Sequence, residues 1–283
     1  MHPKNKYAAH PPDFVRLAAH HRWLLPHLIA SGPDTARIDF RDARAQRELT
    51  YALLAADFGI RLEIPLDSLI PPVPGRLDYV LWLSDLLPAQ SALVDLGTGA
   101  SCIYPLLACR LFPRWRFRAL ESDRRPYEYA CANVARNALG ARISVVHNES
   151  GVLLPLFAEQ LAEHDSRIDA VMCNPPFYSS AQEIAQLANA KQLPPFAACT
   201  GSQAEMITPG GELGFITRMF QESASTPLMK NNVVWYTSLV GKREDVTAIE
   251  ALCQDGNVAR FKADVIKQAK TSRWIVAWSW LNA

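Results

Sequence analysis

The chain has 283 residues, of which 49% are hydrophobic, so its length allows one large domain or a domain with a substantial extension. A formal net charge of +1 argues against attraction of nucleic acid over the whole surface, so any such site must be a local basic patch. No apolar run approaches the roughly 20 residues of a membrane span, and the first residues lack a secretory signal, so we expect neither a membrane-spanning nor a secreted protein.

The six cysteines lie mostly in apolar runs, and none forms a C-x-x-C pair. This usage is typical of small buried side chains in a reducing compartment, and it indicates neither a zinc site nor a disulfide framework. We therefore expect no metal and a location in the nucleus, the cytoplasm or both.

The first part of the chain, residues 1–90, has no alternation of strand and helix patterns. Apolar residues at helical spacing predict a helix over residues 42–58, and we also expect helical stretches over residues 11–30 and 76–87. Residues 64–74 are rich in proline and predict a loop. We interpret residues 1–90 as a helical extension that packs on the main domain.

From Ser91 onward strand and helix patterns alternate, which predicts an α/β fold with a doubly wound parallel sheet. We expect strands over residues 92–96, 115–121, 143–147, 168–173, 233–240, 258–265 and 274–280, and helices over 102–112, 125–139, 152–161, 211–225 and 244–253. Residues 178–209 are weakly patterned, and so long a loop is usually functional or mobile. Seven strands with a final antiparallel hairpin match the Rossmann-like sheet of class I methyltransferases, to which we assign residues 91–283.

The tetrapeptide Asn174-Pro175-Pro176-Phe177 follows an expected strand, at the end where open α/β sheets bind ligands. The two prolines fix the backbone and remove two donors, so the carbonyl groups of Asn174 and Pro175 stay free to accept hydrogen bonds. Beside the flat ring of Phe177, these acceptors suit a planar substrate that carries an exocyclic amino group. A plain turn at the strand end is the alternative.

A glycine-rich turn, residues 97–101, follows the first strand of this domain. Cys102 replaces the third glycine of the dinucleotide fingerprint, which leaves less reason to expect a pyrophosphate. The form Asp95-Leu96-Gly97-Thr98-Gly99 is instead usual in enzymes that bind S-adenosylmethionine. The cofactor site is expected to include Asp95, Gly97, Thr98, Gly99 and Ser101. For Asp95 a role in orienting the turn is the alternative.

The second strand of the domain is expected to end in Glu121. An acidic residue at this place accepts hydrogen bonds from ribose hydroxyls in dinucleotide-binding folds. We therefore expect Glu121 to bind the ribose of the cofactor, with a solvent-facing strand end as the alternative.

Motifs along nearly the whole chain resemble one enzyme family. They include Pro11–Phe14, Asp57–Gly59, Leu69–Pro71, Val73–Pro74, Gly97–Leu107, Cys173–Phe177, Gly210–Leu213, Trp235–Tyr236 and Arg273–Trp274. On these residues the chain resembles the adenine-N6 RNA methyltransferases of the methyltransferase-like protein 16 group, to which the bacterial ribosomal-RNA enzyme RlmF is related. Members of this group modify U6 small nuclear RNA and hairpins in a messenger RNA. The resemblance implies S-adenosylmethionine as cofactor and structured RNA as partner, and we expect a monomer.

By this resemblance, Arg76 binds the methionine carboxylate of the cofactor, and Gly97 and Glu121 hold its backbone and ribose sides. A bidentate pair of arginine with carboxylate suits this role, and a surface arginine at a helix start is the alternative. Asn174 and Phe177 hold the target adenine. The catalytic set is expected to be Asn174, Pro175, Pro176 and Phe177, with Asn174 also contacting the cofactor.

The resemblance also brings the N-terminal tail and the last hairpin near the RNA. The expected RNA-binding residues are Lys4, Lys6, Lys242, Lys270 and Arg273. Lys4 and Lys6 lie on a tail with no apolar pattern to bury it. An alternative RNA path runs along Arg114, Arg116 and Arg118. The chain departs from the family in two places: Lys191 is the only basic residue between Tyr178 and Pro209, and residues 148–151 lack the family's lysine.

These features together predict methyl transfer from S-adenosylmethionine to adenine N6 in structured RNA, with a target like U6 small nuclear RNA. Carbonyl acceptors at Asn174 and Pro175 orient the amine, and no general base is needed before attack. The alternatives are a ribosomal-RNA adenine-N6 or guanine-N2 methyltransferase, a protein-glutamine methyltransferase, whose motif usually ends in tyrosine, and a non-catalytic RNA-binding module.

Overall fold

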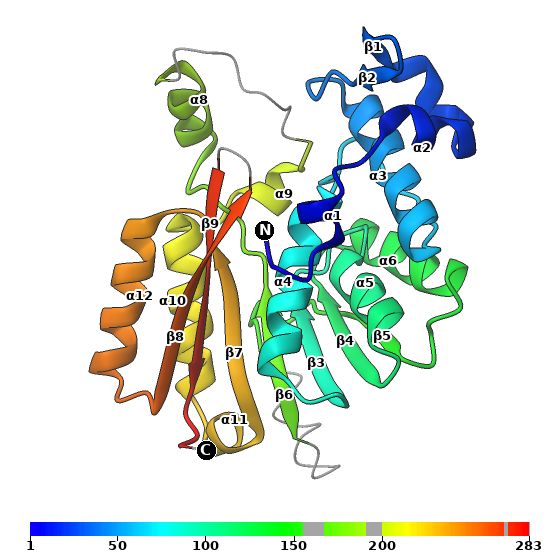
Figure 1. Ribbon diagram of the computed structural model, residues 1–283. Helices are drawn as coiled ribbons and strands as arrows, with labels where there is room; N and C mark the ends of the chain where they lie inside the picture. The colour runs from blue at the N-terminus through cyan, green and yellow to red at the C-terminus, as the bar shows by residue number, and fades with distance from the viewer. Residues whose placement is uncertain (155–166, 191–199, 269–270, 283) are drawn as a thin grey trace.

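The computed structural model of the chain describes residues 1–154, 167–190, 200–268 and 271–282. Its centre is a seven-stranded sheet with helices on both faces (Figure 1). The strands are β3 (Ser91–Leu96), β4 (Trp115–Glu121), β5 (Ile143–His147), β6 (Ile168–Cys173), β7 (Val233–Val240), β8 (Arg260–Gln268) and β9 (Thr271–Ser279), in the order β5-β4-β3-β6-β7-β9-β8. Strands β3 to β7 are parallel, and β9 is antiparallel to β7 and β8. This confirms the predicted doubly wound sheet and its final hairpin.

Helices cover the two faces of the sheet as separate layers. On one face lie α4 (Val73–Leu86), α5 (Ile103–Leu111) and α6 (Arg124–Arg136), and on the other α10 (Gly211–Ala224) and α12 (Arg243–Asp255) (Figure 1). Side chains along each strand alternate between these layers, so Leu93 packs in one core cluster and Val94 in the other. Burial on both faces explains why the central strands are nearly continuous apolar runs.

The extension differs from the prediction over residues 11–30. An α-helix, α2 (Phe14–His20), begins after Asp13, whose Oδ1 accepts a hydrogen bond from the amide of Arg16 at 3.0 Å. It ends at His20, and the 3-10 helix η1 (Arg22–His27) follows with Pro26 inside it. The helical stretch expected through about residue 30 is therefore divided into two shorter helices and ends before β1, and Pro26 lacks the amide that an α-helix would use at its position.

A short hairpin, β1 (Ile29–Gly32) with β2 (Thr35–Arg37), then leads to α3 (Ala43–Phe58). No strand was predicted there. The predicted helix over residues 42–58 is confirmed by α3, which ends at Gly59 with a φ of 61°. A left-handed glycine after the last turn is a frequent helix end.

The helix α4 begins at Val73, earlier than the predicted start at Arg76. Pro74 lies in its first turn, where the amide groups have no partner within the helix, so proline does not interrupt it. The earlier start brings Arg76 onto the helix itself.

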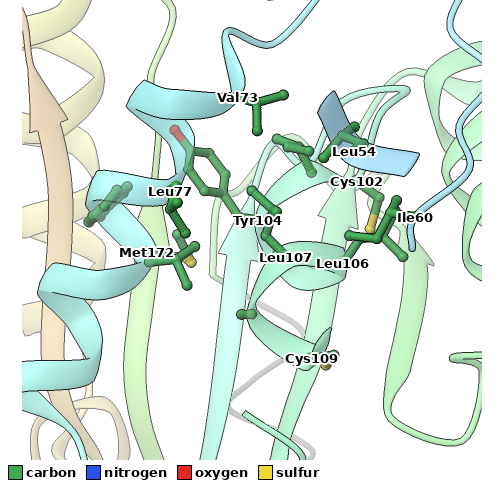
Figure 2. Packing of buried hydrophobic residues seen from close by; sticks show 14 of the residues in the cluster. Leu54, Ile60, Val73, Leu77, Cys102, Tyr104, Leu106, Leu107, Cys109 and Met172 are labelled. Atoms are coloured by element: carbon green, nitrogen blue, oxygen red, sulfur yellow. The ribbon is translucent and has the colours of Figure 1, made fainter. Parts of the chain in front are cut away.

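The extension and the sheet domain share one hydrophobic core (Figure 2). Leu54 of α3 belongs to the same buried cluster as Val73 and Leu77 of α4 and Leu107 of α5. The chain around residue 90 therefore does not separate two cores.

The first residues pack against α4 and do not form the free tail expected around Lys4 and Lys6. Asn5, which precedes α1 (Lys6–Ala9), is 2% exposed, and its Nδ2 donates to Oδ1 of Asp78 at 2.7 Å. Polar contacts of Asn5 and the single buried ring of Tyr7, and not an apolar stripe, hold this segment in place. For that reason, the packing of these first residues on α4 could not be predicted from hydrophobic periodicity.

The weakly patterned residues 178–209 contain two helices in their described parts, α8 (Ala181–Ala190) and α9 (Gln203–Met206). Another short helix that was not predicted, α11 (Pro227–Asn232), precedes β7. The helix expected over residues 152–161 falls mostly outside the described residues. Within the described ranges, no helix is long and apolar enough to cross a membrane.

Candidate active site

A cavity of about 300 Å³ opens at the carboxyl ends of β3, β4 and β6. This is the edge at which open α/β sheets bind ligands. The glycine turn after β3, Glu121 at the end of β4 and Asn174 after β6 all line it. The extension adds Leu69, Pro71 and Arg76 to the wall. The structure thus brings together predicted site residues from segments far apart in the sequence.

The turn after β3 takes a shape that only glycine adopts readily. Gly97 and Gly99 have φ values of 68° and 64°, in the left-handed region. The amide of Thr98 donates to the carbonyl of Leu120 at 2.9 Å, which ties the turn to β4. Thr98 and Ser101 line the cavity beside the two glycines, as predicted for cofactor-site residues.

Asp95 is not among the residues that line the cavity, and its assignment to the cofactor site stays a prediction. Its side chain is buried, and Oδ2 accepts a hydrogen bond from Oγ1 of Thr98 at 2.7 Å. Burial raises the pKa of Asp95 to about 7, although the Thr98 hydroxyl favours the charged form. This hydrogen bond is what the alternative role, orienting the turn, requires.

Backbone amides hold the carboxylate of Glu121 in one orientation. Its Oε2 accepts from Gly99 at 2.8 Å, and its Oε1 accepts from Ser122 at 2.9 Å and Asp123 at 3.0 Å. Burial raises the pKa of Glu121, while these donors favour the ionised form. The residue is 8% exposed, which excludes a solvent-facing strand end.

Arg76 reaches the cavity from α4. Its Nη1 donates to the hydroxyl of Tyr104 at 2.8 Å, and its Nε is buried without a hydrogen-bond partner among the described residues. Burial raises the pKa of Tyr104 to about 12, so the phenol stays neutral at physiological pH. A cationic donor left unpaired beside a cavity suits an anionic ligand group.

Asn174 carries a second buried polar atom without a partner on the cavity wall. Its Oδ1 is buried and has no hydrogen-bond partner in the described part of the chain. Leaving a buried acceptor unpaired costs roughly 1–3 kcal/mol, so a donor from a ligand would stabilise this site. Pro176 also lines the cavity, whereas Pro175 and Phe177 do not.

The loop after Phe177 is fixed by the segment around α9. The amide of Tyr178 donates to the carbonyl of Met206 at 3.0 Å, and Thr208 donates to the carbonyl of Tyr178 at 2.9 Å. Gly211 has a φ of 62°, and a Cβ there would lie 3.3 Å from the amide nitrogen of Ser179. A larger residue at Gly211 would therefore push on this loop.

A buried acidic group lies next to the same loop. Glu212 is 3% exposed, and both its carboxylate oxygens accept from the amide of Gly241, at 2.7 and 2.8 Å. Burial raises the pKa of Glu212 to about 7, and neighbouring Asp245 acts in the same direction. A Cβ on Gly241 would lie 3.1 Å from Nη1 of Arg273, so these groups form one compact cluster.

The predicted RNA-binding residues lie in different surroundings. Three of them form ion pairs within the chain: Lys4 with Asp85, Lys6 with Asp57, and Lys242 with Glu183. Arg273 lies over the ring of Phe177. Lys270 falls outside the described residues. The structure therefore brings Arg273 to the loop after β6, and the RNA-binding roles of all five stay predictions.

Several residues of the cavity wall were not singled out from the sequence. They are Tyr104, Asn148, Glu205 and Arg218. The Asn148 Nδ2 donates to the carbonyl of Val152 at 2.8 Å, so the segment without the family's lysine folds back on itself. Glu205 had a detectable signal, since Ser202 precedes it at the spacing of a capping box. Among the described residues, no cluster of His, Cys, Asp or Glu could hold a metal ion.

Comparison with known proteins agrees with this geometry. A family model described as RNA methyltransferase matches residues 1–282. The RNA N(6)-adenosine-methyltransferase mettl16 of Danio rerio is 37% identical over 287 residues, which cover 100% of this chain and 59% of the relative. The U6 small nuclear RNA (adenine-(43)-N(6))-methyltransferase of Schizosaccharomyces pombe is 36% identical over 261 residues, which cover 89% of this chain and 64% of the relative. The chain thus spans little more than half the length of such relatives.

Solved structures match over the whole chain. The catalytic domain of hMettl16 in complex with the MAT2A 3'UTR hairpin 1 has a TM-score of 0.91 at 35% identity, covering 100% of this chain and 96% of that one. The N-terminal domain of human METTL16 in complex with SAH has a TM-score of 0.81 at 32% identity, covering 99% of each chain. These matches and the family model confirm the resemblance that the sequence motifs predicted, and the chain belongs to the RNA methyltransferase family.

Proposed function

We propose that this chain is an S-adenosylmethionine-dependent RNA methyltransferase that forms N6-methyladenosine in structured RNA. One observation carries the proposal: the buried, unpaired Oδ1 of Asn174 lies on the wall of a cavity whose other groups suit that cofactor. The names of relatives that are 36–37% identical support the reaction. The complex of a structural neighbour with SAH supports the cofactor.

The groups on the cavity wall fit S-adenosylmethionine part by part. Arg76, with its unpaired Nε, would bind the methionine carboxylate, and Glu121 would accept hydrogen bonds from the ribose. Gly97 and Gly99 carry no side chains that would keep a ligand away from the backbone. When bound, S-adenosylmethionine supplies an electrophilic methyl group on a positively charged sulfur.

The acceptors after β6 direct the nucleophile. The Oδ1 of Asn174 and the carbonyl of Pro175 would accept the two N–H groups of the adenine amine, so that its lone pair faces the methyl group. They also stabilise the positive charge that develops on nitrogen as it attacks. The amine becomes acidic only as the new bond forms, so no side chain has to remove a proton first. Positioning and preorganised charge would supply most of the rate.

The target adenine must leave its stack before it reaches Asn174, at a cost of a few kcal/mol. Stacking on Phe177 would recover part of this cost, since a base on an aromatic ring contributes ~1–3 kcal/mol. Arg273 lies over the ring of Phe177 with its guanidinium carbon 5.2 Å from the ring centroid. An incoming base would therefore either take the other face of the ring or move Arg273.

The proposed partner is a structured RNA, a small nuclear RNA or a hairpin that contains the target adenosine. Both kinds of RNA occur in the names of relatives and in the complexes of structural neighbours. A small nuclear RNA target implies a nuclear location. Residues 1–90 would contact this RNA as an extension, because its helix α2 and hairpin β1–β2 lie at the same end of the molecule as α8 and α9 (Figure 1).

The test is methyl transfer to defined RNA. The chain is incubated with labelled S-adenosylmethionine and a hairpin of the U6 type, and the RNA is then digested to nucleosides. We expect label in N6-methyladenosine, and none when the target adenosine is replaced by guanosine. Label in N2-methylguanosine, or in protein glutamine when proteins are offered, would replace the proposal with those alternatives.

A further inference from the structure

Glu205 lies on the cavity wall, and the proposed transfer of a methyl group to adenine gives its carboxylate no task. Glu205 belongs to the short helix α9, and its Oε2 accepts from the amide of Ser202 at 2.9 Å. The same oxygen accepts from the amide of Leu69 at 3.0 Å. Glu205 therefore joins α9 to the proline-rich loop of the extension.

The second oxygen of Glu205 points to the glycine turn. A Cβ built on Gly99 would lie 3.6 Å from Oε1 of Glu205. Within the described residues, no hydrogen bond to this Oε1 is found, whereas Oε2 has two donors. Glu121 accepts from the amide of the same Gly99, so both carboxylates lie beside this turn on the cavity wall. Burial is the main cause of the raised pKa of Glu121, and the charge of Glu205 acts in the same direction.

The α-ammonium group of the cofactor has not yet been assigned a partner in the protein. Its carboxylate is matched by Arg76 and its ribose by Glu121, but the α-ammonium group carries three donors and a positive charge. Asp95 cannot receive it, because Asp95 is bound to Thr98 and does not line the cavity. Glu121 is already assigned to the ribose hydroxyls, in addition to the three backbone amides from which it accepts. The Oε1 of Glu205 is the acceptor that lies beside the turn and has no donor in the described part of the chain.

We propose that Glu205 binds the α-ammonium group of S-adenosylmethionine through Oε1. The inference rests on the proposed function and names a further cofactor-binding residue for it. A charged pair between carboxylate and ammonium is stronger than a neutral hydrogen bond. Because Oε2 holds the amide of Leu69, the same side chain would link the loop of the extension to the bound cofactor.

The test compares two ligands by calorimetry: S-adenosylhomocysteine and the same molecule without its amino group. Glu205→Gln keeps one oxygen for the amides of Ser202 and Leu69 but removes the charge. We expect Glu205→Gln to lower the affinity for S-adenosylhomocysteine by about tenfold or more. Its affinity for the deaminated ligand should not change. Wild-type protein should itself bind the deaminated ligand more weakly by a similar factor.

A structural role for Glu205 would give another pattern. If Glu205→Gln weakens both ligands equally, or weakens neither, the proposed contact is wrong. Ser202→Ala serves as the matched control, since it removes the hydroxyl that caps α9 and keeps the charge of Glu205; any loss it causes should be equal for the two ligands. Failure of the wild-type protein to bind S-adenosylhomocysteine would instead overturn the proposed function.

Discussion

The guanidinium carbon of Arg273 lies 5.2 Å from the centroid of the Phe177 ring, so a cation of the last strand contacts the loop that follows β6. Burial raises the pKa of Glu212, and the charge of Arg273 partly offsets this effect by favouring the ionised carboxylate. A phosphate near the target base would find its counter-ion here.

Arg273→Ala is expected to weaken RNA binding. Loss of one phosphate contact should lower the slope of log affinity against log salt concentration by about 0.7–0.9. Cofactor affinity should not change, because Arg273 does not line the cavity. Arg116→Ala is the control, since Arg116 lies near the amino end of β4, and the proposed site lies at the carboxyl ends of the parallel strands. A slope changed by Arg116→Ala and not by Arg273→Ala would move the RNA path to the amino end of β4.

Asn174→Ala is expected to abolish methyl transfer and to change cofactor affinity by no more than a few-fold. Its unpaired Oδ1 would touch the adenine amine, whereas Arg76 and Glu121 anchor the cofactor. Single-turnover transfer and calorimetry with S-adenosylhomocysteine measure the two effects separately. Near-normal turnover in the variant would reject the catalytic assignment.

Glu121→Ala and Arg76→Ala should each weaken cofactor binding by ~1–3 kcal/mol, the scale of a lost charged hydrogen bond. RNA affinity, measured without cofactor, should barely change, because both side chains face the cavity and not the surface proposed for RNA. Calorimetry with S-adenosylhomocysteine and a separate RNA titration measure the two affinities. Unaltered cofactor affinity in both variants would mean that the cofactor binds outside the cavity at the carboxyl ends of β3 and β4.

The raised pKa of Glu212 predicts a pH dependence of stability. An unperturbed glutamate has a pKa of 4.5 and Glu212 in the folded protein has one of about 7, so between these values the folded state binds the extra proton. Stability from this group is full below pH 4.5 and falls as pH rises toward 7, by up to about 1.4 kcal/mol per pH unit. Urea unfolding at several pH values should give a flatter profile for Glu212→Gln than for wild type. If the two proteins show the same dependence of unfolding free energy on pH, other groups such as Asp95 cause it.

Asn5→Ala is expected to destabilise the fold by ~1–3 kcal/mol, because a buried amide that pairs with Asp78 is lost. Lys4→Ala removes only a half-exposed ion pair with Asp85 and should cost less than about 1 kcal/mol. Thermal and urea unfolding compare the two variants. If Lys4→Ala proves the more damaging, the ion pair and not the buried amide docks the first residues.

Strands of the sheet could be predicted closely where burial is complete. The predicted bounds of β6 and β7 match the structure because each is a buried, mostly apolar run. The predicted bounds of β4 and β5 also match, although polar residues such as Arg116 and Ser144 interrupt these strands. The hairpin β1–β2 and the helix α9 were missed, since such short elements depend on local turns and caps more than on apolar period.

Site residues could be predicted only where they belong to a recognisable sequence motif. Glu121, Arg76 and Asn174 follow from motifs, and the structure brings them to one cavity. For Asp95, the sequence does not reveal that Thr98 donates a hydrogen bond to its carboxylate, so both of its expected roles stayed open. Glu205 comes from a segment far along the chain, and only folding brings it beside Gly99.

The continuous packing of Leu54, Val73 and Leu77 against Leu107 limits how the extension can be exchanged. A chimera that takes residues 1–90 from a relative would import one half of an interlocked apolar interface. Unless the surface of α5 is exchanged with it, the hybrid would contain voids or overlaps at that interface. RNA selectivity could therefore be transplanted between family members only together with the helix that follows the glycine turn.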